Sequence, residues 1–191
     1  MSVRTLAVTR SAAGVPTGRL AVWWVLVSEI VVFGGVLVSY VMHRLGHPEW
    51  ASEAAHTNTW AGAFNTLVLL TSSLAAVLAH HAAEGGDGRR AARLLRLTAL
   101  GGLAFLAVKG LEWAHEIGEG FTLQAGGFWS YYYLAAGLHA FHVIAGIGLM
   151  LWVASTAAKG EALHRVENVG LYWHFVDIVW IFLFPLLYIA K

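Results

Sequence analysis

The stretch Gly170–Lys191, GLYWHFVDIVWIFLFPLLYIAK, decides the fold class of this 191-residue chain. It is an apolar run long enough to cross a bilayer, yet it carries His174 and Asp177 about one helical turn apart. A charged group at the centre of a bilayer costs about 3 kcal/mol or more on insertion scales. We therefore expect this segment to lie inside a membrane bundle or complex, where protein surrounds its polar side chains.

The composition of the whole chain agrees with a membrane protein. Hydrophobic residues make up 58% of the sequence and charged residues 12%, whereas soluble domains have about 25% charged residues. The absence of cysteine excludes disulfides, thiolate metal sites and cysteine nucleophiles. The net charge of +1 does not indicate nucleic-acid binding, and none is expected. The sequence predicts a short basic arm, residues 1–19, followed by one transmembrane domain, residues 20–191.

Five segments of the chain are apolar over the roughly 20 residues that a membrane helix needs. Short polar connections separate them. The fourth segment is longer than one crossing requires, so we expect it to be tilted or to extend beyond the bilayer. The sequence thus predicts an all-α fold, a polytopic bundle of five membrane helices. The predicted spans are Arg19–Met42, Trp60–Ala82, Leu94–Ile117, Gly127–Ala158 and Val166–Ala190.

The distribution of lysine and arginine predicts the orientation of the five spans, because cytoplasmic loops carry an excess of these residues. Nine lysines and arginines fall on one side of the predicted spans. The other side has only Arg44 and Lys191, and Lys109 is inside a span. We therefore expect a cytoplasmic N-terminus and an outside C-terminus. The nine cations assigned to the cytoplasmic side are Arg4, Arg10, Arg19, Arg89, Arg90, Arg93, Arg96, Lys159 and Arg165.

Polar side chains inside the spans can be assigned a depth at about 1.5 Å per residue. Lys109 and Glu112 fall near the outer boundary, and their spacing favours an ion pair at the membrane interface that neutralises both charges. Two interpretations of Glu29 stay open, a protonated carboxyl bonded to a neighbouring helix or a site that exchanges protons. Five groups could share one layer on the cytoplasmic side of the midplane: Glu29, His139, His142, His174 and Asp177.

The histidines invite a haem or metal assignment, because imidazoles at matching depth on two helices could ligate haem. Only His139, His142 and His174 lie inside spans at a suitable depth, whereas His80 is at the cytoplasmic boundary. Asp177 could accept a hydrogen bond from a histidine that binds the metal, without binding the metal itself. Hydrogen-bonded structural histidines explain the pattern more simply, so we expect no metal site.

Motifs in the first three spans resemble those of subunit III of the haem-copper oxidases. The first span has SEIVVF, which places Glu29 at the family's buried carboxylate. The second has NTLVLLTSSLAAVLAHH, similar to the family's Asn-Thr start at Asn65 and Ala-His end at His80. The third has LEW, which resembles the family's Glu-aromatic pair and places Glu112.

The last two spans carry the longest motifs of this resemblance. The fourth has AGLHAFHVIAG, which matches the family's pair of histidines through His139 and His142. The fifth has Glu167 followed by YWHFVDIVWIFLF. The resemblance covers almost all of residues 20–190, and the chain begins at the equivalent of the third span of seven-span members. It is therefore similar to the short bacterial form, although Lys109 stands where oxidase subunits typically show glutamine.

The resemblance implies an auxiliary subunit without catalytic, cofactor-binding or metal-binding residues of its own, in the inner membrane of a bacterium. Haem and copper would belong to the partner subunits I and II. The subunit would support proton uptake by subunit I, protect it from inactivation and hold membrane lipids. The buried functional or structural polar residues would be Glu29, Asn65, His80, Lys109, Glu112, His139, His142, Glu167, His174 and Asp177.

Three alternatives remain at this point. The five-span plan also resembles the accessory protein of nitric oxide reductases, a branch of the same family. A stand-alone di-histidine haem or metal protein would show a Soret band in the isolated chain. A small proton-linked transporter would more often show repeats and helices broken by glycine or proline, and only Pro185 lies inside a span.

Overall fold

The computed structural model describes residues 17–190 as five long helices, a short connecting helix and a terminal turn of π-helix. Each long helix is long and apolar enough to cross a membrane, the last one together with the π-helix. The predicted all-α fold with five spans is therefore confirmed. The elements are α1 Thr17–Gly46, α2 Trp50–Ala54, α3 Thr59–Glu84, α4 Gly88–Gly118, α5 Gly127–Ala157, α6 His164–Phe184 and η1 Pro185–Ile189.

Four of the five long helices begin earlier than hydropathy predicts, and the starts of α1 and α4 show why. α1 begins at Thr17, so the end of the predicted basic arm belongs to a helix, and the rest of the arm, residues 1–16, lies outside the described residues. α4 begins at Gly88, six residues before the predicted span. The Asp87 side chain accepts a hydrogen bond from the Arg90 amide at 2.9 Å and caps this end. Hydropathy misses such polar turns because they extend beyond the apolar core of a bilayer.

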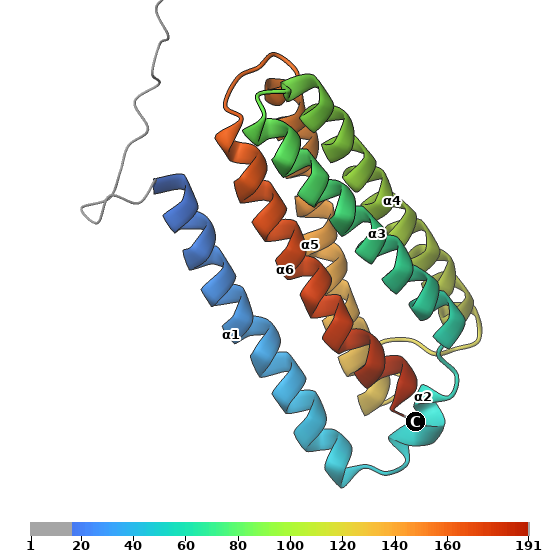
Figure 1. The fold of residues 1–191 in the computed structure, drawn as a ribbon. Coiled ribbons are helices and arrows are strands. Elements are labelled where there is room, and N and C mark those ends of the chain that lie inside the picture. The colour runs from blue at the N-terminus through green and yellow to red at the C-terminus, as the bar shows by residue number, and fades with distance from the viewer. Residues whose placement is uncertain (1–16, 191) are drawn as a thin grey trace, which may run out of the picture.

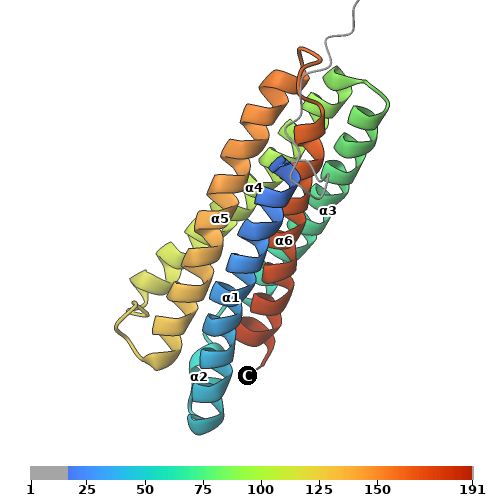
Figure 2. The same ribbon diagram turned by 90° about the vertical axis from the view of Figure 1, so that its left-hand side faces the viewer.

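Helices α3 to α6 form the main bundle, and α1 lies along one side of it against α5 and α6 (Figures 1 and 2). The buried residues of α1 are Leu26, Phe33 and Tyr40, which follow one another at seven-residue spacing and form a single stripe. The other faces of α1 expose large apolar side chains, among them Trp24 and Val31. α1 is therefore held by a narrow contact, and most of its surface is available to lipid or to another chain.

Trp173 on α6 is the fully buried centre around which four helices pack. Its indole N–H donates to Ser72 Oγ on α3 at 3.1 Å. Glycines on the two other helices admit the ring: a Cβ atom at Gly102 on α4 would lie 2.7 Å from it, and one at Gly146 on α5 would lie 2.8 Å from it. Helices can approach this closely in membrane bundles where small residues occupy the contact.

The start of α1, the α3–α4 turn and the α5–α6 connection lie at one end of the bundle, and α2 and the chain's C-terminal end lie at the other (Figure 1). The cations at the first end include Arg19, Arg89 and Arg165, whereas Arg44 is at the other. The orientation relative to the cytoplasm stays a prediction that follows from this asymmetry. Lys191 lies outside the described residues.

Candidate functional site

The contact between α1 and α5 contains a pair of titratable groups, Glu29 and His142. Glu29 Oε2 lies 3.1 Å from His142 Nε2, and the two side chains are 21% and 9% exposed. Phe33 covers the pair, because its ring meets the imidazole edge-on at a centroid distance of 5.2 Å. The structure thus brings together two residues that the sequence places at similar depth.

The hydrogen bonds of His142 determine how many protons this pair holds. Its Nδ1 lies 2.8 Å from the carbonyl oxygen of Leu138, which can only accept, so Nδ1 carries a proton. A close contact between Nε2 and Glu29 Oε2 then requires one proton, on either the nitrogen or the oxygen. In both cases the pair has no net charge. A proton can therefore move between the two atoms without leaving an isolated charge in the bundle.

His174 and Asp177 lie between α3 and α6. His174 Nδ1 is 2.6 Å from Ser73 Oγ, and Asp177 is buried beside the same serine. His139, by contrast, is fully buried between the rings of Phe105 and Trp180, at centroid distances of 5.3 and 5.2 Å. Neither of its ring nitrogens has a hydrogen-bond partner among residues 17–190. The three span histidines thus have three separate environments.

Lys109 and Glu112 form the predicted ion pair, with Lys109 Nζ 3.2 Å from Glu112 Oε2. The pair is buried within the bundle, since the two side chains are 2% and 3% exposed. Lys109 Nζ also donates to the Tyr132 hydroxyl at 2.7 Å and to the Tyr188 hydroxyl. These residues, the Lys109 cluster, therefore join α4, α5 and η1.

The remaining predicted site residues lie apart from these groups. Asn65 is fully buried and donates weakly to the Phe105 carbonyl at 3.4 Å. Of the polar residues expected to be buried, four are only partly so: Glu29, His80, Glu167 and His174. His80 and Glu167 lie near the charged end of the bundle. His80 contacts Glu84 at 3.5 Å, and Glu167 contacts Arg19 at 3.6 Å. No group of three or more metal-ligating side chains occurs within residues 17–190.

Three members of the Lys109 cluster were not predicted from the sequence: Glu116, Tyr132 and Tyr188. The Tyr132 hydroxyl lies within donating distance of a carboxylate oxygen of Glu116, at 2.8 Å, and of Glu112, at 3.1 Å. Helical spacing could have predicted Glu116, because it follows Lys109 by seven residues and Glu112 by four and so shares their helix face. The tyrosines could not have been predicted, because near the ends of membrane helices they resemble the usual aromatic belt.

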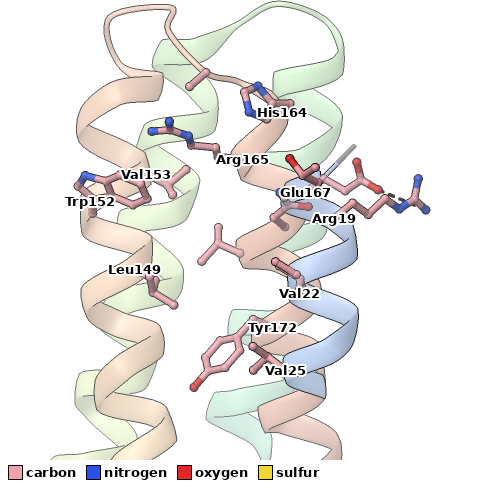
Figure 3. Close-up of a pocket in the computed structure, with 16 residues that line it drawn as sticks. Arg19, Val22, Val25, Leu149, Trp152, Val153, His164, Arg165, Glu167 and Tyr172 are labelled. Carbon is pink, nitrogen blue, oxygen red and sulfur yellow. Dashed lines mark ion pairs between the residues drawn. The ribbon is translucent and has the colours of Figure 1, made fainter. Parts of the chain in front are cut away.

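A groove of about 700 Å³ separates the first half of α1 from the facing ends of α5 and α6 (Figure 3). Its walls are mostly apolar, with Val22 on α1 and Leu149 on α5. Its open end is charged. Arg19 pairs with Glu167, and the guanidinium carbon of Arg165 lies 4.9 Å from the centroid of the Trp152 ring. An apolar groove with Arg19 and Arg165 at its open end is suited to a lipid-like molecule with an anionic head group.

Comparisons with known proteins agree with the resemblance in the motifs. The family model described as cytochrome c oxidase subunit III matches residues 9–191. The chain is similar to cytochrome c oxidase subunit 3 of Thermostichus vulcanus, with 32% identity over 86% of this chain and 83% of the relative. It is also similar to cytochrome c oxidase subunit 3 of Corynebacterium diphtheriae, with 32% identity over 87% of this chain and 84% of the relative.

A third relative is a longer protein, the heme-copper oxidase subunit I+III of Aeropyrum pernix. It is 30% identical over 90% of this chain and 22% of its own length. The match to the family model includes all five spans and the buried groups described above. The chain therefore belongs to the cytochrome c oxidase subunit III family.

Proposed function

We propose that the chain is an auxiliary, non-catalytic subunit of a haem-copper oxidase in the inner membrane of a bacterium, where it flanks subunit I. The observation that carries this proposal is the family match across residues 9–191. The Aeropyrum pernix relative is named as subunits I and III in one protein, which supports subunit I as the direct partner. The relatives above are named as oxidase subunits, so nothing favours a nitric oxide reductase as the partner.

Within this role, Glu29 and His142 would hold a proton for the partner enzyme. The pair lies on the narrow contact by which α1 joins the bundle, and it is partly exposed on the Glu29 side. Its single proton can sit on either residue, so it could be handed on from Glu29, the more exposed of the two side chains. Release would leave the pair with one negative charge until another proton arrives. Glu29 lies in the first half of α1, nearer the cation-rich end of the bundle, and we propose that this end faces the cytoplasm. Haem and copper would be supplied by the partner subunits I and II.

The groove beside α1 would hold a membrane phospholipid. Val22, Leu149 and the other apolar wall residues match an acyl chain, and Arg165 at the open end can contact a phosphate. A bound lipid would also fill the space that separates α1 from α5 and α6 at this end. It would thereby stabilise the helix that carries Glu29.

Affinity purification tests the proposed partner directly. A tagged copy of the chain, extracted from its native membranes in mild detergent, should carry a haem-copper subunit I with it, and the eluate should consume oxygen. A tagged unrelated membrane protein from the same cells controls for incomplete extraction. Recovery of the chain alone, or with a nitric oxide reductase, would contradict the proposal. A Soret band in the chain freed of its partners would instead support the di-histidine haem alternative.

A further inference from the structure

The Lys109 cluster contains more acid than base. Lys109, Glu112 and Glu116 are all buried, so water does not screen their charges. One ammonium faces two carboxyl groups, and no second cation joins them within residues 17–190. If both carboxyls were ionised, the bundle would contain an uncompensated buried negative charge, which is strongly unfavourable.

The hydrogen-bond donors of the cluster are also too few for two carboxylates. The ammonium of Lys109 has three protons, and it uses them on Glu112 Oε2, Tyr132 and Tyr188. The Tyr132 hydroxyl has one proton but lies within reach of Glu112 Oε1, at 3.1 Å, and Glu116 Oε1, at 2.8 Å. It can therefore donate to only one of them at a time.

The groups around Glu116 do not make up the deficit. Tyr188, on η1, lies beside Glu112 and within 3.2 Å of the Tyr132 hydroxyl, so its one proton serves that side of the cluster. Tyr133, on α5, lies beside Glu116 but donates to the Phe121 carbonyl at 2.7 Å. Glu116 Oε2 consequently has no donor among the described residues, although it is buried.

We propose that Glu112 and Glu116 share one bound proton through the Tyr132 hydroxyl. When the proton leaves the Glu116 carboxyl for Tyr132 Oη, the tyrosine's own proton passes to Glu112 Oε1, and the reverse step restores the first state. No charge enters or leaves, because Lys109 balances whichever carboxyl is ionised. Glu116 lies two residues before the end of α4 at Gly118, so the site is close to the loop that joins α4 to α5.

This proton-binding site is separate from the Glu29–His142 pair and goes beyond the function proposed above. The pair lies between α1 and α5, whereas the cluster joins α4, α5 and η1 towards the opposite end of the bundle. It also depends on Lys109, whose ammonium is the only cation of the cluster among the described residues. Without that cation, neither carboxyl could stay ionised at low cost.

Infrared spectroscopy of the purified complex, with the chain's glutamates labelled with ¹³C, can count protonated carboxyls. Glu116→Gln should remove one protonated glutamic acid from the spectrum. Glu112→Gln should also remove one, because the single carboxyl left would pair with Lys109 and ionise. Lys109→Gln should add one, since Glu112 loses its counter-ion. Glu84→Gln, at an exposed position on α3, is the matched control and should change nothing.

The opposite results would overturn the proposal. An unchanged carboxylic acid band in both Glu116→Gln and Glu112→Gln would mean that both groups are ionised in the parent. No gain in Lys109→Gln would mean that Lys109 does not set the proton count, and this variant decides the matter if the glutamate variants fail to assemble. Tyr132→Phe should keep the band area but shift its frequency, and an unshifted band would exclude the relay through Tyr132.

Discussion

Substitution of Glu29 by glutamine separates the hydrogen bond of the α1–α5 contact from its proton. Glutamine keeps the shape of the side chain, and its amide N–H can donate to His142 Nε2, which is 3.1 Å from the oxygen it replaces. Glu29→Gln thus reproduces the form of the pair in which the proton sits on the carboxyl, but this proton cannot leave. We expect α1 to stay in place in this variant.

The expected cost to stability distinguishes glutamine from leucine at this position. Hydrogen bonds between membrane helices contribute about 0.6 kcal/mol on average and up to about 1.7 kcal/mol. Glu29→Gln keeps such a bond, so the change in the free energy of unfolding should stay below about 1 kcal/mol. Glu29→Leu leaves His142 Nε2 without a partner in a largely buried site, and the cost should rise to about 1–3 kcal/mol.

Two assays on the purified complex test these expectations. Retention of the chain after heating in detergent should be the same for Glu29→Gln and the parent, and lower for Glu29→Leu. Oxygen consumption over many turnovers should fall, or inactivation should accelerate, in Glu29→Gln, most clearly at high pH, where protons are scarce. Ser28→Ala, on an exposed face of the same helix, is the control. Identical pH profiles and lifetimes for Glu29→Gln and the parent would refute the proton-holding role.

Two further substitutions test the packing and the groove. Gly146→Ala places a methyl group 2.8 Å from the buried ring of Trp173 and should cost about 1–3 kcal/mol in thermal unfolding; Gly148→Ala, whose Cβ meets nothing within 4 Å, should cost nothing, and equal unfolding of the two would contradict the packing argument. Arg165→Ala should lower the amount of anionic phospholipid that co-purifies with the complex, measured by mass spectrometry, whereas Arg89→Ala, at an exposed position, should not. Unchanged lipid content in Arg165→Ala would mean that the groove does not bind the headgroup.

The number of helices was predictable because a span must be apolar over a length set by the bilayer. The similar depth of Glu29 and His142 followed from the same geometry, since depth along an antiparallel pair of helices can be counted from the two ends. Which of the five groups in that layer meet did not follow from depth, and the structure shows the contact. The proton count of that pair was not predictable. It depends on which ring nitrogen faces the Leu138 carbonyl, and this is a matter of side-chain orientation.

In the Lys109 cluster, sequence spacing predicts the contacts within one helix but not those with other elements. Spacing along α4 predicts that Lys109 and Glu112 meet, and it extends to Glu116. The contributions of Tyr132 and Tyr188 come from other elements and depend on how those elements rotate about their axes. The π-turn after Pro185 directs Tyr188 inward, and a helix continued in the α conformation would place that residue differently.

The most direct test of the central claim compares the oxidase purified from cells with and without this chain. If the chain is an auxiliary subunit without redox centres, haem and copper per subunit I should be the same in both preparations, and so should the initial rate of oxygen consumption at low pH. The preparation without the chain should then lose activity sooner during continuous turnover. Loss of haem or copper, or equal lifetimes of the two preparations, would contradict the account.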